Sequence, residues 1–294
     1  MIVVTAPTGN IGGQVLKNLL DEDAQVRVVV RDPGKLSEDV RSRIEVVVGS
    51  HGDTGVVREA LVGADALFWL VPPDPKAPSV EAAYVEFSRP AANAIRANGV
   101  KRVVVVTALG RGTPMAERSG YVKASLMMDD LIAGTGVAMR QLTMPSFMDN
   151  ILFQLEPIKS KGMFFSPIDG DLKLPSCATR DIAAVAAELL TDDSWSGQDH
   201  VAVMGPEDLS WNDMAAVMTD VLGSAIRFQR ISFDDYKAQF LKNGMSDAMA
   251  QGMTDMAIAK NEGLDQAEPR TAQSSTPTSF RTWCETVLKP AVDA

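Results

Sequence analysis

The chain has 294 residues, of which 46% are hydrophobic and 22% charged, and its formal net charge is −10. These proportions are ordinary for a globular protein, and the length suits one large α/β domain or a nucleotide-binding domain with a smaller companion. The acidic balance argues against non-specific binding of nucleic acids and against association with anionic membranes.

The cysteines, histidines and apolar runs narrow the class of protein further. Two cysteines are too few for a disulfide framework, and two histidines cannot build a histidine-rich metal site. No apolar run approaches the roughly eighteen residues of a membrane span, and the N-terminus enters a strand-like run in place of a signal peptide. We therefore expect a cytoplasmic protein that acts on a small molecule as a monomer or homodimer, with no metal, membrane or nucleic acid as partner.

The first twenty residues carry the strongest motif. Residues 2–5 are an uninterrupted apolar and β-branched run, which is typical of a strand buried on both faces. Gly9 and Gly12 follow, and apolar residues then recur at helical spacing. Strand, glycine turn and helix form the first half of a dinucleotide-binding unit, in which the helix N-terminus faces a pyrophosphate. Ala6 stands where the usual fingerprint has glycine, and the alternative is a tight turn without a ligand.

Arg31 ends the second strand-like run, about twenty residues beyond the glycine turn, where the adenosine ribose is recognised. A carboxylate there would favour NAD, whereas an arginine can pair with a 2′-phosphate and favours NADP. Asp32 follows immediately, so a solvated charge pair at a strand end is the alternative. The sequence therefore predicts NADP(H), with NAD as the less favoured cofactor.

Strand-like and helical segments alternate through the first half of the chain. Strands are expected at residues 25–31, 44–48, 66–71, 102–107 and 137–144, and helices at 54–61, 79–98 and 121–133. Pro90 predicts a kink or a break of the second helix near Arg89. This alternation predicts a doubly wound parallel Rossmann sheet. Asp53 precedes a helix and is a candidate adenine contact or an N-cap, while Pro72 and Thr107 follow or end strands at the ligand-binding edge.

The second half of the chain is less regular. Two short strands flanking residues 166–171 are expected to form a hairpin, followed by helices near 182–190, 211–222 and 233–242. Methionines at positions 245, 249, 253 and 256 suit either a core stripe or an adaptable lid over an apolar substrate. We expect residues 1–150 to form the Rossmann domain and residues 151–294 a smaller α+β substrate domain, with interleaved segments possible.

Several of these stretches together resemble the NmrA-like family, whose members are atypical short-chain dehydrogenases/reductases. The resemblance is carried by residues 5–12, 28–33, 52–68 and 142–150, and residues 179–183 resemble the family's C-terminal domain. It covers most of the chain up to about residue 200 and is diffuse beyond that point.

The resemblance implies an NADP(H)-preferring Rossmann domain and a small C-terminal domain that forms a cleft over the nicotinamide. The residues implied in pyrophosphate binding are those of the glycine turn: Thr8, Gly9, Asn10, Ile11 and Gly12. Arg31 would hold the 2′-phosphate, Pro72 and Thr107 would line the cofactor cleft, and Lys123 would reach the nicotinamide ribose. Family members are either NAD(P)H-dependent reductases, of quinones and related acceptors for example, or cofactor-sensing regulators without turnover.

The candidate catalytic residues are Tyr121 and Lys123. The superfamily uses a tyrosine and a lysine four residues later on one helix, and the lysine lowers the pKa of the phenol. Here the two are only two residues apart, which places them on different helix faces, and Tyr121 can instead be a helix-start aromatic. A quinone-like acceptor takes hydride readily, so positioning could supply most of the catalysis. The sequence thus favours an NAD(P)H-dependent reductase of an apolar or aromatic carbonyl, quinone or enone, with an NADP(H)-sensing regulatory protein as the alternative.

Overall fold

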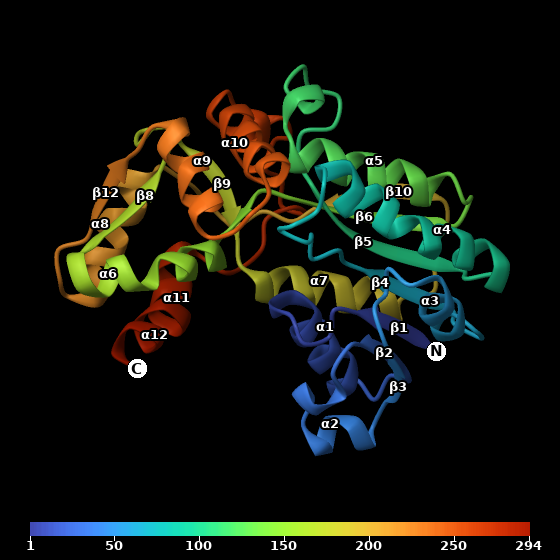
Figure 1. Cartoon of the computed structure of the whole chain (residues 1–294). Helices are drawn as coiled ribbons and strands as arrows, with labels where there is room; N and C mark the ends of the chain where they lie inside the picture. The colour runs from blue at the N-terminus through green and yellow to red at the C-terminus, as the bar shows by residue number, and fades with distance from the viewer. The chain divides into compact units, whose positions relative to one another are not determined.

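The computed structural model covers residues 1–294 and divides into two compact units, which are described separately. The first unit contains Met1–Thr107, Ala124–Thr143 and Ile182–Val201, and the second contains Ala108–Lys123, Met144–Asp181 and Ala202–Ala294. Each unit therefore draws on three separate stretches of the chain (Figure 1).

A seven-stranded sheet forms the middle of the first unit, with the strand order β10-β6-β5-β4-β1-β2-β3. Its strands are β1 (Ile2–Thr5), β2 (Val26–Val30), β3 (Glu45–Val48), β4 (Ala66–Trp69), β5 (Arg102–Ala108), β6 (Ala138–Met144) and β10 (Gln198–Ala202). β1 pairs in parallel with both β2 and β4, and the chain order reverses between β1 and β4. This is the doubly wound order, whose ligand site lies at the carboxyl ends of the strands beside that reversal. The predicted fold class is confirmed.

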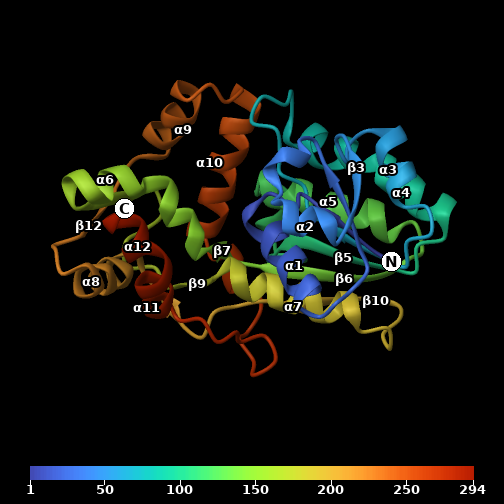
Figure 2. The ribbon, with the colours of Figure 1, turned by 90° about the horizontal axis from the view of Figure 1, so that it is seen from below.

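Helices cover both faces of this sheet (Figures 1 and 2). One face carries α1 (Asn10–Asp21) and α7 (Thr179–Thr191), and the other carries α3 (Thr54–Ala60), α4 (Phe87–Asn98) and α5 (Tyr121–Ala133). Every residue of β4 is buried, and Leu67 and Trp69 pack in the same core as α3, α4 and α5. Because successive strand residues point to opposite faces, a sheet covered on both sides needs apolar residues at every position.

The irregularity expected near Pro90 takes the form of a π-helical turn. This turn, η2 (Ala82–Glu86), leads directly into α4, and Pro90 lies inside α4. Proline has no N–H to donate to the carbonyl four residues earlier, which here belongs to Glu86. The widened turn thus ends at the residue whose usual hydrogen-bond donor is missing, and the helical path continues to Asn98.

The second unit contains two small sheets, with strand orders β11-β9-β7 and β12-β8. Their strands are β7 (Ser146–Phe147), β8 (Met163–Ser166), β9 (Leu174–Cys177), β11 (Asp208–Leu209) and β12 (Arg227–Arg230). Helical elements of this unit are η3 (Ala116–Arg118), η4 (Met148–Gln154), α6 (Leu155–Lys161), α8 (Trp211–Leu222), α9 (Phe233–Lys242), α10 (Asp247–Asn261), η5 (Leu264–Gln266), α11 (Phe280–Trp283), η6 (Cys284–Leu288) and α12 (Lys289–Asp293).

The predicted hairpin of residues 163–174 is wrong. β8 pairs in parallel with β12, and β9 pairs with β7 and β11 instead of with β8. The intervening loop is held by other elements: Asp169 donates its N–H to Asn261 Oδ1, and Gly170 accepts from the N–H of Asn212. A turn-rich loop between two apolar runs indicates two strands but does not identify their partners.

The methionines of the predicted stripe lie in the second unit, three of them on α10 and Met245 just before it. Met249 is fully buried, whereas Met245, Met253 and Met256 are half-buried. One of the four therefore packs in the core, and three keep part of their surface accessible.

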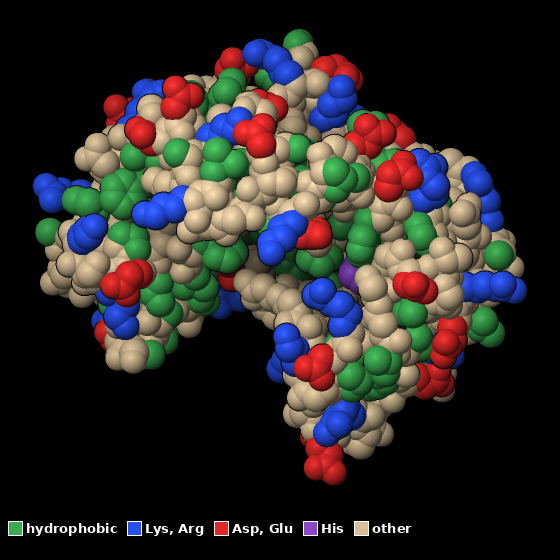
Figure 3. Space-filling view, viewed as in Figure 1, with side chains coloured by type: hydrophobic (Ala, Val, Ile, Leu, Met, Phe, Trp, Pro, Cys, Tyr) green, Lys and Arg blue, Asp and Glu red, His purple; other side chains and the backbone are tan.

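None of the helices combines the length and the hydropathy that a membrane span requires. On the face seen in Figure 3, acidic and basic side chains are interspersed.

Candidate functional site

The glycine turn leaves the N-terminus of α1 open to solvent. Gly9 is the N-cap of α1, no side chain caps this end, and the first turn carries no acidic residue. Thr8, Gly9 and Asn10 are exposed, and the first N–H of the helix to bond within it is that of Gly13, which donates to Gly9 O. The preceding N–H groups at Ile11 and Gly12 are thus available to a ligand, and the helix dipole favours an anion there.

Ala6 and Gly12 are forced into close contact by this turn. Ala6 has a φ of +51°, the left-handed conformation that glycine adopts at least cost, at the position where the fingerprint usually has glycine. A Cβ on Gly12 would lie 2.2 Å from the carbonyl oxygen of Ala6, so this position accepts only glycine. Alanine at position 6 therefore keeps the turn geometry that the fingerprint's glycine would give. The strain of the left-handed backbone falls on the methyl group of Ala6.

Thr5 joins the carboxyl ends of β1 and β4. Its hydroxyl donates to Phe68 O at 3.0 Å and accepts from the N–H of Leu70 at 3.0 Å. These bonds fix the two strand ends that flank the reversal of strand order. Sequence analysis assigned Thr5 only to the strand, and its polar character at the end of an apolar run was the available signal.

Arg31 and Lys35 are exposed cations at the carboxyl end of β2 that form no ion pair with another side chain of the protein. Between them, Asp32 is the N-cap of the short helix η1 (Pro33–Lys35), and its Oδ1 accepts from the N–H of Gly34 at 3.0 Å. Asp32 therefore orders the loop and is not paired with Arg31. Lys35 was missed by sequence analysis, although a second cation four residues after Arg31 was visible in the sequence.

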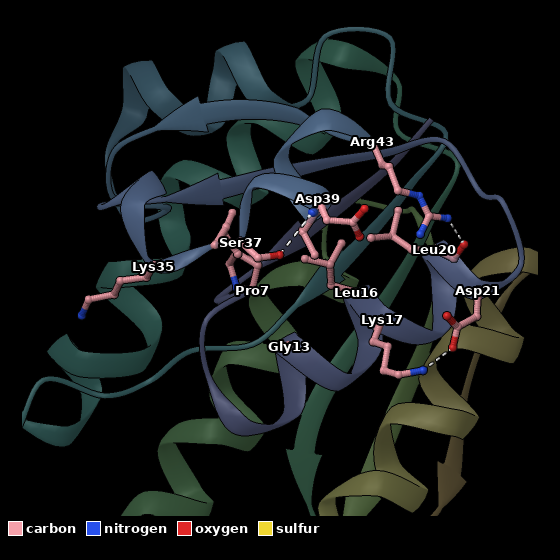
Figure 4. A pocket seen from close by; sticks show the side chains of 12 residues that line it. Pro7, Gly13, Leu16, Lys17, Leu20, Asp21, Lys35, Ser37, Asp39 and Arg43 are labelled. Carbon is pink, nitrogen blue, oxygen red and sulfur yellow. Dashed lines mark hydrogen bonds and ion pairs between the residues drawn. The ribbon is translucent and has the colours of Figure 1, made fainter.

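A pocket of about 400 Å³ lies beside this loop, between α1 and α2 (Glu38–Ser42) (Figure 4). Its apolar part is formed by Pro7, Leu16, Leu20, Leu36 and Val40, and Lys35 lies at one end. None of the residues predicted to bind the cofactor lines it. The pocket is therefore distinct from the open end of α1.

Asp53 is the N-cap of α3. Its Oδ1 accepts from the N–H groups of Gly55 and Val56 at 2.8 and 3.1 Å. The capping interpretation of this residue is therefore present in the structure, and its contact with adenine stays a prediction.

Thr107 lies in a buried polar network at the end of β5. Its hydroxyl donates to Asp129 Oδ2 at 2.7 Å and lies 2.9 Å from the Ser125 hydroxyl, which must then be the donor to Thr107. Ser125 and Asp129 are four residues apart on α5 and share one helix face. The network therefore ties α5 to β5 near the carboxyl end of that strand. Pro72, by contrast, is exposed after β4.

Tyr121 and Lys123 belong to the second unit, at the start of α5. Burial, and to a smaller extent the neighbouring Tyr236, raise the pKa of the Tyr121 phenol to about 12. Lys123 forms an ion pair with Glu117 at 3.1 Å. Lys123 stands two residues after Tyr121, where the superfamily pair has its lysine four residues after, and the pKa of the Tyr121 phenol is raised where that pair would lower it.

A comparison with known protein families gives the decisive observation. The model of the NAD(P)H-binding family matches residues 7–193, which include β2–β6, α1, α3, α4, α5 and α7. The chain belongs to the NAD(P)H-binding family.

Two curated relatives match the chain over most of its length. The NAD(P)H azoreductase of Xenophilus azovorans is 27% identical over 256 residues, which are 87% of this chain and 86% of the relative. The (4-alkanoyl-5-oxo-2,5-dihydrofuran-3-yl)methyl phosphate reductase of Streptomyces griseus is 32% identical over 235 residues, which are 80% of this chain and 78% of the relative.

Among solved structures, an NADPH-dependent quinone oxidoreductase of Escherichia coli complexed with NADPH has a TM-score of 0.78 and 22% identity. The match covers 96% of this chain and 97% of that one. At this identity the likeness establishes a common fold.

The residues present fit the cofactor of the NAD(P)H-binding family. The open N-terminus of α1 offers N–H groups to a pyrophosphate, and Gly12 lets the helix approach β1 closely. Arg31 and Lys35 offer unpaired positive charge at the strand end that follows.

His51 is a buried residue of the connection between β3 and α3. Its ring packs edge-on against Trp69 and Phe87, and its Nε2 lies 3.1 Å from Leu70 O. A carbonyl oxygen only accepts, so Nε2 carries the proton of the neutral ring. Burial, opposed by the bond to Leu70 and assisted by the charge of Arg31, lowers the pKa of His51 from 6.5 to about 4. His51 is therefore a buried packing residue.

His51 is expected to make the protein lose stability in mild acid. The folded state resists protonation of this ring, so the stabilisation is complete above pH 6.5 and is lost as the pH falls through about 4. At about 1.4 kcal/mol per pH unit, the loss amounts to roughly 3 kcal/mol. Urea unfolding of the wild type and His51→Gln between pH 7 and pH 4 measures it. The free-energy gap between the two proteins should shrink on acidification, and a constant gap would contradict the assignment.

Proposed function

We propose that the protein is an NAD(P)H-dependent reductase of small apolar or aromatic acceptors such as quinones, azo compounds, enones or carbonyls. The observation that carries the proposal is the match with the azoreductase of Xenophilus azovorans over 87% of this chain. The open end of α1 supports it, because a dinucleotide pyrophosphate is the anion that this turn suits. We further propose that the second unit selects the acceptor.

The preferred cofactor is NADP(H). Arg31 can form a two-pronged contact with the 2′-phosphate, and Lys35 adds a second charge. Asp32 would favour NAD if it accepted from the ribose hydroxyls, but it accepts from Gly34 in the loop. Neutralising a phosphate with two otherwise unpaired cations requires no existing ion pair to break.

Bound NADPH supplies a hydride, and a quinone that accepts it takes up one further proton to become the hydroquinone. The N–H groups of Ile11 and Gly12 would hold the pyrophosphate, and Lys123 would contact the ribose. The proton can come from water, because a quinone oxyanion is a stable product of hydride addition. The chain's main contribution is then to position the two reactants.

Tyr121 is expected to contribute little to turnover with quinones. A phenol with a pKa of about 12 is a poor proton donor near neutral pH, since efficient acids have a pKa close to the working pH. Tyr121→Phe should therefore lower kcat by less than about tenfold and leave its pH dependence unchanged. Steady-state rates between pH 6 and pH 9 measure this effect. A loss of about 10²–10⁴ would identify Tyr121 as the general acid.

The alternative function is a regulatory protein of the NmrA type that binds NADP(H) without turnover. The spacing and environment of Tyr121 and Lys123 favour this alternative, because they do not form the superfamily's catalytic pair. In that case the second unit would bind a protein partner.

One experiment separates the two functions. Purified protein is mixed with NADPH and a panel of quinones, azo dyes and enones, and the loss of dihydronicotinamide absorbance is followed. Turnover with one or more acceptors supports the reductase. NADPH binding in calorimetry without turnover of any acceptor would favour the regulatory protein.

A further inference from the structure

The segment that connects β2 to α2 in the first unit carries charges of both signs. Arg31 and Lys35 are exposed cations without an ion pair, and Asp32 stands between them in the sequence. By its charge alone, a carboxylate in a phosphate-binding segment weakens the site, because it repels the anion. An aspartate between the two residues proposed to hold the 2′-phosphate therefore calls for a structural explanation.

Asp32 closes the turn that follows it. Its Oδ1 accepts from the N–H of Gly34 at 3.0 Å, and its carbonyl oxygen accepts from the N–H of Lys35 at 3.2 Å. The N–H of Leu36 then donates to Pro33 O at 3.1 Å. These three hydrogen bonds fix the backbone of residues 32–36, and two of them end on Asp32.

The residues after Asp32 suit this cap. Pro33 occupies the first turn of η1, where the missing N–H has no helical partner and the fixed φ matches the helical path. The carboxylate lies directly over Gly34, since a Cβ on this glycine would be only 3.1 Å from Asp32 Oδ1. Aspartate is among the best N-cap residues, because its short side chain reaches the N–H groups of the first turn. The backbone position of Lys35 is therefore defined from the N-terminal side.

The other end of the turn is anchored in the apolar pocket between α1 and α2. Leu36 is buried and lines this pocket together with Leu16 and Leu20. Figure 4 shows the side chain of Lys35 extended and pointing away from Leu16 and Leu20. Lys35 is thus held between the cap and a buried leucine, while its ammonium group makes no hydrogen bond within the chain.

We propose that Asp32 is a positioning residue for NADPH, which orders the turn so that Lys35 meets the 2′-phosphate beside Arg31. This inference rests on the proposed use of Arg31 and Lys35 as the contacts of the 2′-phosphate. It gives Asp32 the opposite of the effect that its charge suggests, because an acidic residue here strengthens the binding of an anion. Asp32 acts through Lys35 and does not touch the cofactor.

Ordering the turn before binding favours the cofactor that uses Lys35. A lysine on a loose segment would lose backbone freedom as well as side-chain freedom when it contacts a phosphate, and the ordered turn removes the backbone part of that loss. NADH has a hydroxyl in place of the 2′-phosphate, so it gains nothing from this arrangement. The contribution of Asp32 should therefore appear in the ratio of the affinities for NADPH and NADH.

The test measures dissociation constants for NADPH and NADH by calorimetry in wild type, Asp32→Ala and Asp32→Asn. Both substitutions remove the same negative charge, but only asparagine keeps an oxygen that can cap the turn. Asp32→Ala should bind NADPH about 3- to 10-fold more weakly than Asp32→Asn, which is the range expected from the loss of one N-cap. The two variants should bind NADH within about twofold of each other, because NADH does not use Lys35.

Charge alone predicts a different result. Without the positioning role, both variants would bind NADPH equally and at least as tightly as wild type, since each has lost a repulsive charge. Equal NADPH affinities of the two variants would overturn the inference and leave the role of Arg31 intact. Equal losses for NADPH and NADH in Asp32→Ala would indicate a merely structural role and would also overturn it. If wild type bound NADPH no more tightly than NADH, the proposed cofactor preference would fail, and the inference with it.

A double-mutant cycle tests whether Asp32 acts through Lys35. In the Lys35→Ala background, the difference in NADPH affinity between Asp32→Ala and Asp32→Asn should shrink to less than about twofold, because no lysine is left to position. An undiminished difference in that background would overturn the inference. Both positions are exposed, so the single and double variants should fold normally.

Discussion

Replacing Gly12 by alanine is expected to abolish NADPH binding and to destabilise the first unit. The added Cβ would lie 2.2 Å from Ala6 O and 2.9 Å from Thr5 O, both backbone atoms that cannot move aside independently. α1 would have to shift away from β1, taking the N–H groups at its N-terminus with it. We expect affinity for NADPH to fall more than 100-fold, and the free energy of unfolding to fall by about 2–4 kcal/mol. Calorimetric titration and urea unfolding measure the two effects.

Gly13→Ala is the matched control for this substitution. Its Cβ would lie 3.2 Å from Pro7 O, a tight contact that a shift of a few tenths of an ångström relieves. Alanine is also the better helix former by about 0.5–1 kcal/mol, which offsets the crowding. Gly13→Ala should therefore bind NADPH within a few-fold of wild type. Similar behaviour of the two variants would refute the role given to the contact between Gly12 and Ala6.

Replacing Arg31 by aspartate is expected to reverse the preference between NADPH and NADH. The substitution removes a charge-assisted hydrogen bond worth about 1.5–3 kcal/mol and adds repulsion against the 2′-phosphate. Affinity for NADPH should fall about 100-fold, whereas affinity for NADH should stay the same or rise because a carboxylate suits the ribose hydroxyls. Lys35→Ala should show a smaller loss of the same kind. Dissociation constants for both cofactors at two salt concentrations measure these effects.

Arg41→Asp controls for the change in net charge. Arg41 is an exposed residue of α2 in the same unit, and it forms no ion pair. If Arg41→Asp weakened NADPH binding as much as Arg31→Asp, the effect would be one of general charge. Equal losses for NADPH and NADH in Arg31→Asp would remove Arg31 from the 2′-phosphate site.

The strands of the sheet could be predicted because one requirement, burial on both faces, decides which residues they contain. A strand buried on both faces needs an unbroken apolar run, and the runs that became β1 and β4 satisfy it. The glycine turn could also be predicted, because only glycine tolerates the close approach of position 12 to the carbonyl oxygen of Ala6. These features depend on residues that are neighbours in the sequence.

Features that depend on distant partners were not predicted. β8 finds β12 more than sixty residues later, and no local pattern distinguishes that partner from a hairpin. Burial of His51 arises from Trp69 and Phe87, which lie on other elements. Phe153 is exposed, which its sequence context did not predict. Its apolar neighbours Ile151 and Leu152 suggest a core segment, and only the three-residue period of η4 places Phe153 on a different face from Ile151.

The interleaving of the two units has a consequence for work with fragments. A fragment ending at Asn150 would lack α7 and β10, which complete one face and one edge of the central sheet. β6 would then become an edge strand with unpaired N–H and carbonyl groups, and apolar residues of the uncovered face would meet water. Exposed edges and apolar faces of this kind promote aggregation. The first unit therefore needs residues 182–201, which follow segments of the second unit in the chain, to keep its sheet covered, so exchanging parts of the second unit calls for replacing internal segments within the intact chain.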